Sequence, residues 1–166
     1  MTRCTVRYRA RQFLRALGAH PTAAELTQTR QLLSEPHWRL FRAMAPRDQW
    51  HSIETLRLLR ERGQASEDLA LAALLHDAGK GHVRLHERVL YVLLARWPWL
   101  LRQLAAERGP HWRSALYRTA GHAVSGARLA CEAGANARVT HLIRHHHCAT
   151  TADTELLALI EADDRA

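Results

Sequence analysis

Apolar residues recur along the chain at intervals of three and four positions, and turn signals separate the apolar runs roughly every 12 to 20 residues. This spacing is typical of amphipathic α-helices, and no segment alternates with the period of two that marks a half-buried strand. The pattern therefore predicts an all-α bundle without a sheet. We expect helices over about residues 2–17, 22–33, 34–44, 46–62, 66–77 and 83–96, a short helix after Gly109-Pro110, and further helices over 119–133, from 136 into 145–147, and from 153 almost to the end.

Several helix boundaries carry a recognisable signal. Thr22 with Glu25 has the spacing of a capping box, and Pro46 suits the first turn of a helix. The Trp97-Pro98-Trp99 segment should end one helix and begin another, and we expect both tryptophans to pack in the core.

Length and charge narrow the class of protein. A chain of 166 residues with 47% hydrophobic content suits one globular domain with a real core. The net charge of +8 comes almost wholly from arginine, because Lys80 is the only lysine. A basic surface fits an anionic partner such as a nucleotide, a nucleic acid or a membrane face, although an arginine-rich composition can equally reflect coding bias.

The cysteines and the N-terminal segment indicate the cellular compartment in which we expect the protein. Cys4, Cys131 and Cys148 are odd in number and far apart, so neither a disulfide framework nor a zinc knuckle is indicated, and we expect a reducing, cytoplasmic setting. No apolar run approaches the ~20 residues of a membrane span. The basic segment from Thr2 to Leu17 lacks the apolar stretch of a secretory signal. Plain helical packing of that segment is favoured over a transit peptide or a membrane-surface helix.

In three separate helices a metal-type ligand ends an apolar stripe with the spacing i, i+3, i+4 and i+7. The stripes end in His76, His146 and Asp163 and consist of Leu69-Ala72-Ala73-His76, Val139-Leu142-Ile143-His146 and Leu156-Leu159-Ile160-Asp163. Asp77 follows His76 directly. A core histidine beside a capping aspartate would explain His76-Asp77 alone. A carboxylate at the buried end of a stripe is harder to explain as packing, since an unpaired buried aspartate weakens folding.

Two further histidines extend the set of candidate ligands. His122 is followed one turn later by Gly126, which would allow another helix to approach closely. His51 begins a helix whose apolar residues follow it. In chain order the candidates are His51, His76-Asp77, His122, His146-His147 and Asp163.

This ordered set resembles the HD-domain superfamily of metal-dependent phosphohydrolases. More narrowly, it is similar to the HDIG-type branch, whose motif is His, His-Asp-x-Gly-Lys, His-x-x-x-Gly, His-His and Asp. The matching residues are His51, His76-Asp77-Ala78-Gly79-Lys80, His122-Ala123-Val124-Ser125-Gly126, His146-His147 and Asp163. The resemblance covers roughly residues 47–165 and implies an HD-domain helical bundle over residues 46–166, with residues 1–45 as an N-terminal helical extension packed on it.

The resemblance also implies one or two divalent metal ions. The first would be held by His51, His76, Asp77 and Asp163, and the second by Asp77 as a bridge with His122, His146 and His147. Imidazole and carboxylate ligands suit iron, manganese or zinc alike. Asp77 and Lys80 would be the catalytic residues, with Lys80 holding a phosphate oxygen. A simpler interpretation of Lys80 is a cation at a helix end.

Some features depart from the family pattern or leave alternatives open. The run His145-His146-His147 leaves the register open by one, and hydrophobic phasing favours His146 as the inward residue. Cys148 stands where relatives often have Glu, and the Gly-Tyr-Pro element of the cyclic-di-GMP-cleaving branch is absent. Asp164 is an alternative to Asp163, which lies close to the end of the sequence.

The most specific function that these features imply is hydrolysis of a small-molecule phosphate ester, which we expect to be a nucleotide, with a metal-activated water as nucleophile. The alternatives are a catalytically weak regulatory module that binds metal and nucleotide, and a basic nucleic-acid-binding protein with Trp97 and Trp99 as stacking groups. His82 and His86 could line the pocket entrance, but a solvated or packed position is favoured for each. Arg84 and Arg88 could contact a phosphate, but a solvated face is favoured for both. The oligomeric state is not indicated by the sequence.

Overall fold

The computed structural model describes residues 19–148 and 150–166, so the helix predicted over residues 2–17 lies outside the described part of the chain. Within that part every regular element is helical and no strand occurs, which confirms the all-α prediction. The elements are α2 (Ala23–Leu32), α3 (Glu35–Arg42), α4 (Pro46–Glu61), α5 (Glu67–Leu75), the 3-10 turn η1 (Ala78–Lys80), α6 (Leu85–Leu94), α7 (Pro98–Leu104), α8 (His111–Glu132), α9 (Ala137–His145) and α10 (Thr154–Asp163).

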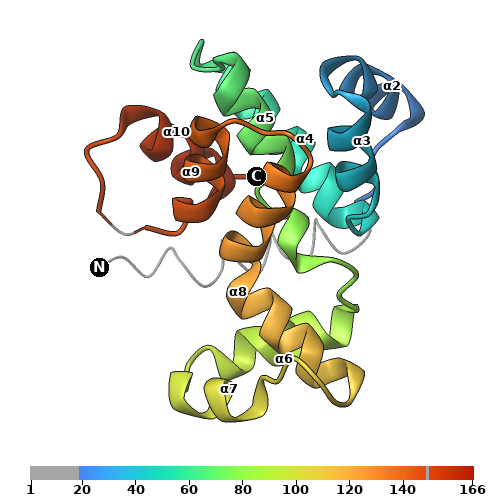
Figure 1. Ribbon diagram of the computed structural model, residues 1–166, viewed down its shortest axis with the longest axis vertical. Coiled ribbons are helices and arrows are strands. Elements are labelled where there is room, and N and C mark those ends of the chain that lie inside the picture. Colours follow the sequence, from blue (N-terminus) through green and yellow to red (C-terminus); the bar gives the residue numbers. More distant parts are fainter. Residues whose placement is uncertain (1–18, 149) are drawn as a thin grey trace.

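The long helix α8 organises the molecule (Figure 1). It packs against η1 and α9, while α6 and α7 flank its N-terminal half at the lower end of the view in Figure 1. Helix α5 contacts both α4 and α9, and α10 packs on all three of these helices. Helices α4, α5, α8, α9 and α10 thus converge around one region.

One apolar cluster fills the space between these helices. Its fully buried members include Leu59, Leu75, Ile143 and Leu159 from four different helices. A fully buried leucine or isoleucine contributes about 1.5–3 kcal/mol relative to an exposed one. Phe41 of α3 belongs to the same cluster, so α3 packs on this core. The division between an extension ending at residue 45 and a domain beginning at residue 46 stays a prediction.

The helix boundaries follow the predicted signals in most places. The capping box is formed, with Thr22 N donating to Glu25 Oε2 over 2.7 Å and Glu25 N donating to Thr22 Oγ1 over 3.2 Å. The two helices predicted after residue 110 were wrong, because α8 is continuous from His111 to Glu132. No proline or glycine lies at their expected junction, and the Thr119 hydroxyl donates back to Ala115 O over 2.8 Å instead of capping a new helix.

The predicted break at Trp97-Pro98-Trp99 is confirmed, since α6 ends at Leu94 and α7 begins with Pro98. The expectation that the two tryptophans pack in the core is wrong. Trp97 is 51% exposed and Trp99 is 62% exposed. Among the described helices, none combines the length and the apolar character needed to cross a bilayer.

Gly79 lies where η1 touches α8. A Cβ added to Gly79 would lie 2.1 Å from His122 O and 2.6 Å from Gly126 N. Gly126 belongs to the same contact, because its own added Cβ would lie 3.2 Å from Gly79 N. The two glycines therefore allow the backbone after Asp77 to lie directly on the turn of α8 that carries His122. This is the close approach that we expected at Gly126.

Replacing Gly79 by alanine should therefore destabilise the protein by about 1–3 kcal/mol, because the new methyl group meets backbone atoms that cannot move aside. Gly121→Ala on the exposed side of α8 is the matched control, since nothing lies within 4 Å of its added Cβ. Gly121→Ala should be neutral or stabilise by about 0.5–1 kcal/mol. Urea unfolding with a chelator present measures both, and equal stability of the two variants would contradict the close-contact account.

Candidate metal centre

His76 and Asp77 occupy the end of α5, an almost wholly apolar helix. Ser66 caps its start, with its Oγ accepting from Leu69 N over 3.2 Å. Leu69 is fully buried, and the helix delivers His76 and Asp77 into the interior with 0% and 2% exposure. Asp77 has left the helical conformation, with φ −92° and ψ 0°, and begins η1. The apolar burial of α5 thus brings an imidazole and a carboxylate to one buried point.

Three histidines are oriented in the same way by their own helices. His76 Nδ1 lies 2.9 Å from Ala73 O, and His122 Nδ1 and His146 Nδ1 contact the carbonyl three residues earlier at 2.7 and 2.6 Å. A carbonyl can only accept, so Nδ1 must carry the hydrogen. In the neutral imidazole the lone pair then lies on Nε2, which is the arrangement of a metal-ligating histidine.

The first group of candidate ligands contains His51, His76, Asp77 and Asp163. Asp163 Oδ1 lies 2.7 Å from His51 Nε2 and 3.3 Å from His76 Nε2, and Asp77 Oδ1 lies 3.6 Å from His76 Nε2. Ligand atoms of His51, His76 and Asp77 all fall within 4.8 Å of one another. Asp164, the alternative to Asp163, has an exposed side chain.

The second group contains His122, His146 and His147. His122 Nε2 lies 3.2 Å from His146 Nε2 and 3.0 Å from His147 Nε2. His146 is buried, whereas His145 is half-buried on another side of α9. Asp77 Oδ1 lies 3.5 Å from His122 Nε2, nearly the same as its distance from His76 Nε2. Asp77 therefore lies between the two groups, and so does His146, because ligand atoms of His76, His146 and Asp163 also fall within 4.8 Å of one another.

The residues present fit a divalent cation. His76 Nε2 is buried without a hydrogen-bond partner, although carboxylate oxygens lie near it. His122 and His146 point Nε2 at each other while each has its hydrogen on Nδ1, so neither can donate to the other. A cation between these lone pairs would satisfy them. The donor set of imidazole nitrogens and carboxylate oxygens suits iron, manganese and zinc.

Burial and charge set the protonation of the two groups. Burial lowers the pKa of His122 to about 4 and that of His146 to about 3, so both are neutral ligands near pH 7. Burial would raise the pKa of Asp77, but Lys80 and His76 outweigh it and hold that pKa well below its usual range. Burial opposes a charge on His76, but Asp77 and Asp163 outweigh it and raise the His76 pKa to about 9. Two ionised carboxylates therefore attract positive charge to the first group.

A cavity of about 500 Å³ opens beside the second group, and three cationic side chains are among the residues that line it. Arg47, Lys80 and Arg88 line it together with Tyr91, Val92, Thr119, Ala120, His122 and His147. Lys80 Nζ donates to Asp77 Oδ2 over 2.6 Å, and Asp77 in turn raises the Lys80 pKa against the opposing effect of burial. Lys80 therefore connects the carboxylate of the ligand groups to the wall of the cavity.

The sequence did not lead us to predict Arg47 and Asp48 near this cavity, and the position that we expected for Arg88 was wrong. Asp48 is buried and accepts from Arg88 Nη1 over 2.9 Å, with a second contact to Arg88 Nη2. The solvated position favoured for Arg88 was therefore wrong, because the pair with Asp48 draws it inward. Arg47 precedes His51 by four residues, so this i, i+4 spacing was the signal that could have placed Arg47 on the same helix face.

The other neighbouring residues agree with their simpler interpretation. His82, His86 and Arg84 are exposed. Arg118 of α8 donates to Lys80 O over 3.4 Å and to His82 O over 3.3 Å, which holds the loop after η1 against α8.

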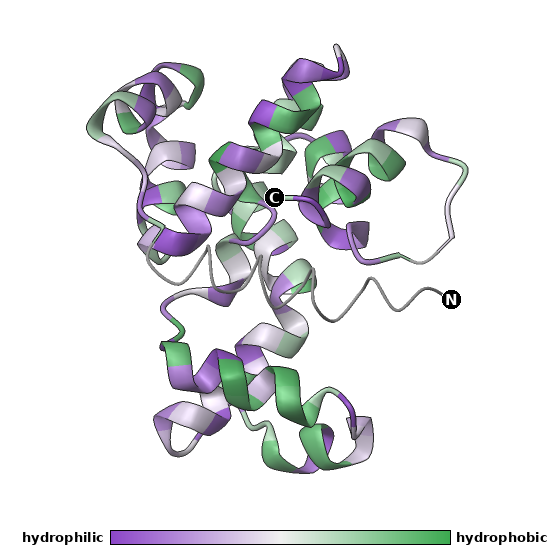
Figure 2. Cartoon of the chain, turned by 180° about the vertical axis from the view of Figure 1, so that it is seen from behind, coloured by the Kyte–Doolittle hydropathy of each residue, from purple (hydrophilic) through white to green (hydrophobic). Residues whose placement is uncertain are grey.

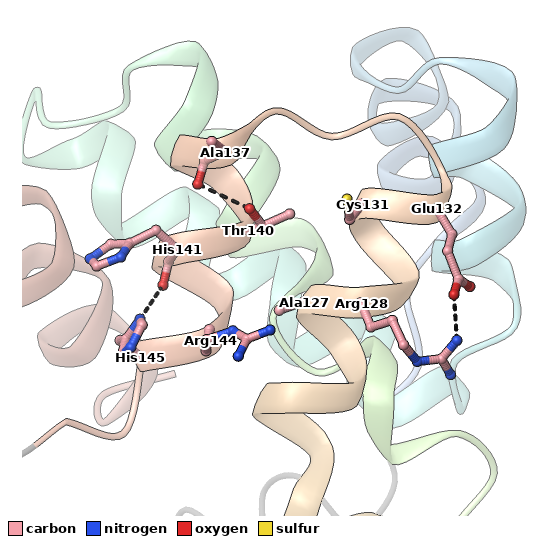
Figure 3. Close-up of a pocket in the computed structure, with 9 residues that line it drawn as sticks. All are labelled: Ala127, Arg128, Cys131, Glu132, Ala137, Thr140, His141, Arg144 and His145. Carbon is pink, nitrogen blue, oxygen red and sulfur yellow. Dashed lines mark hydrogen bonds and ion pairs between the residues drawn. The ribbon is translucent and has the colours of Figure 1, made fainter.

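A second hollow of about 420 Å³ lies between α8 and α9, and it contains ligand-type residues that do not converge (Figure 3). His145 Nδ1 contacts His141 O over 2.9 Å, and Glu132 pairs with Arg128. Figure 3 shows His141 and His145 on the opposite side of the hollow from Cys131 and Glu132. This arrangement does not gather ligands around one point.

A protein-family model described as HD domain matches residues 50–165. The chain belongs to the HD-domain family. The HD match spans the helices that carry all seven candidate ligands, from His51 to Asp163, and proteins of the HD-domain family are generally metal-dependent hydrolases. Comparison with curated proteins and comparison with solved structures gave no match. Arg47 and Asp48 precede the matched HD segment.

The contrast between His146 and His145 provides a test of the metal centre. His146→Ala should lower the metal affinity at least about 10–100-fold, because it removes a buried Nε2 from the second group. His145→Ala, one residue earlier on the same helix end, should leave the metal content unchanged. Elemental analysis of the purified variants measures both. Equal metal loss in the two variants, or none in either, would contradict the assignment of His146.

Proposed function

We propose that this HD-domain protein is a metal-dependent phosphohydrolase that cleaves a phosphate ester, and that its substrate is a nucleotide. The observation that carries the proposal is the cavity lined by Arg47, Lys80 and Arg88, because it opens directly beside His122 and His147. Asp48 and Asp77 offset the charges of Arg88 and Lys80 in part, but three cationic side chains against two carboxylates leave this region positive. A phosphate bound there would lie next to the candidate ligand groups.

The residues proposed to hold the metals are those of the two groups described above. His51, His76, Asp77 and Asp163 would hold the first ion, and Asp77 with His122, His146 and His147 would hold the second. When bound, divalent metal ions polarise water and neutralise the charge of a phosphoryl group. One or two ions of iron, manganese or zinc are consistent with this donor set.

Asp77 and Lys80 are the proposed catalytic residues. Asp77 stays ionised because Lys80 and the histidines outweigh its burial, so it can hold a cation or accept a hydrogen bond. Lys80 is one-fifth exposed towards the cavity and keeps its charge through Asp77. Its ammonium group has three donors and uses one on Asp77 Oδ2, so it can also bind a phosphate oxygen.

The cavity walls support a nucleotide as the phosphate ester. Arg88 is fixed by two contacts to Asp48, so its position does not depend on substrate. Tyr91 and Val92 of α6 form an aromatic and apolar wall beside the cations. A base can stack on a tyrosine while the phosphate contacts the cations. The volume of about 500 Å³ lies in the range of small-molecule sites.

The two alternative functions have unequal support. A regulatory module would use the same pocket and would retain a nucleotide without releasing product. A nucleic-acid-binding face is less well supported, because the arginines are scattered and many are paired with carboxylates. Such pairs include Arg30–Glu35, Arg62–Glu161, Arg128–Glu132 and Arg138–Asp153.

The proposed function is tested by phosphate release from a panel of nucleoside monophosphates, other phosphomonoesters and phosphodiesters. We expect turnover of a nucleotide with manganese or iron present, and loss of turnover when a chelator removes the metal. Restoring the metal should restore activity. Tight nucleotide retention without product would indicate the regulatory alternative. No turnover of any ester by protein with bound metal would overturn the proposal.

Lys80→Ala should lower kcat/KM about 10²–10³-fold, which is the usual effect of removing one charged donor from a developing oxyanion. Arg84→Ala is the control, since Arg84 is exposed and does not line the cavity. Steady-state kinetics should be compared at equal metal content, because Lys80 also contacts Asp77. A Lys80→Ala variant as active as Arg84→Ala would rule out contact between Lys80 and the phosphate.

A further inference from the structure

Helix α6 packs on the protein through the side that carries Glu87 and Leu94, and it leaves a row of aliphatic residues exposed on the other side. Glu87 is 1% exposed and accepts from Arg84 N over 2.8 Å and from His111 Nδ1 of α8. The opposite side of α6 carries exposed aliphatic residues, with Val92 at 61% and Leu93 at 55%. Leu94 is buried on the same inward side as Glu87, so α6 packs one partly apolar side on the protein and presents a second apolar side to solvent. Packing within the protein therefore does not account for the exposed aliphatic residues of α6.

The apolar stripe continues into the segment after α6. Trp97 and Trp99 are both more than half exposed, and α7, which follows Trp97, contacts α6. We call this set the α6–α7 face; it consists of Leu85, Val89, Val92, Leu93, Trp97 and Trp99. Figure 2 shows the hydrophobic segments of α6 and α7 together in the lower part of the molecule. Single exposed apolar residues are ordinary, but a grouped set marks an interaction surface.

Within residues 82–106 the exposed charges of Asp, Glu, Lys and Arg side chains are of one sign, and the next carboxylate along the chain is Glu107. Between His82 and Ala106 the only carboxylate is Glu87, which is buried. Arg84, Arg96 and Arg102 are exposed and form no ion pair within residues 19–148 and 150–166. The face therefore combines aliphatic residues, two tryptophans and arginines that form no ion pair. It suits a partner that has anionic groups at its surface and an apolar layer beneath them.

We propose that the α6–α7 face docks on a membrane surface with anionic headgroups. Tryptophan is favoured at the boundary between headgroups and acyl chains, and exposed leucine and valine bury area there. Each arginine near an anionic bilayer adds electrostatic attraction. A second copy of the chain fits less well, because a two-fold contact would bring two sets of arginines into one interface, and the one carboxylate within residues 82–106, Glu87, is buried.

Docking would place the proposed substrate cavity near the bilayer. Val92 belongs both to the α6–α7 face and to the wall of the cavity that contains Lys80. The docking proposal does not depend on the proposed function, because it concerns the outer side of α6 and is measured without substrate.

The test is sedimentation of the full-length protein with vesicles of phosphatidylcholine containing about 30% phosphatidylglycerol, beside vesicles of phosphatidylcholine alone. We expect binding to the anionic vesicles that weakens in about 0.5 M salt. Leu93→Asp and Trp99→Ser should each lower the partition coefficient about tenfold, because both remove apolar area from the contact. Leu32→Asp on α2 is the matched control, since Leu32 is 48% exposed and lies outside the face, and its binding should equal that of the parent protein.

Several outcomes would overturn the proposal. These are absence of binding to anionic vesicles, binding unchanged in both face variants, or equal loss in Leu32→Asp. A dimer that Leu93→Asp dissociates, without vesicle binding, would assign the face to a second copy. Retention of single-stranded RNA that Trp99→Ser abolishes, without vesicle binding, would assign it to nucleic acid. Thermal unfolding by circular dichroism shows whether each variant is folded, and if Leu93→Asp is not, Trp99→Ser decides the test alone.

Discussion

The buried carboxylate of Asp77 determines what the surrounding site must contain. Its Oδ2 accepts from Lys80 Nζ over 2.6 Å, while its Oδ1 lies 3.5 Å from His122 Nε2 and 3.6 Å from His76 Nε2. Removing a carboxylate from water costs several kcal/mol unless positive charge lies close to it. Lys80 of η1 and His76 at the end of α5 provide that charge, and the middle turn of α8 brings His122 to the same carboxylate.

The geometry of the candidate site follows from helix packing more than from loop conformation. The imidazoles of His76, His122 and His146 are each held by a carbonyl of the same chain three residues earlier, so their directions follow the positions of α5, α8 and α9. Those positions depend in turn on Gly79 and Gly126, where the backbone of η1 touches α8. A change in the contact between these elements would move ligand atoms without altering any ligand residue.

The sequence allowed the helical fold and the clustering of ligand-type residues to be predicted, and the reason is periodicity. His76, His146 and Asp163 end apolar stripes, so the same pattern that buries α5, α9 and α10 also buries His76 and His146 and half-buries Asp163. The Asp48–Arg88 pair could not be predicted, because it joins α4 to α6 across 40 residues and neither residue interrupts a helix pattern. The continuity of α8 was missed for a local reason, since Thr119 resembles a cap but bonds within the helix.

The orientation of α6 marks the limit of arguments from periodicity. Aliphatic residues occur on more than one side of α6, so their spacing alone does not show which side packs against the protein. The inward side is the one that carries Glu87 and Leu94, and there Glu87 accepts from His111 of α8. The contact of Glu87 with Arg84 N lies within the first turn of α6 and does not depend on this orientation. Leaving Leu93 and Val92 exposed forgoes part of the roughly 1.5–3 kcal/mol that full burial of each side chain gives. The proposed contact of the α6–α7 face with an anionic bilayer would recover that free energy, which links the exposed side of α6 to the position of the substrate cavity beside it.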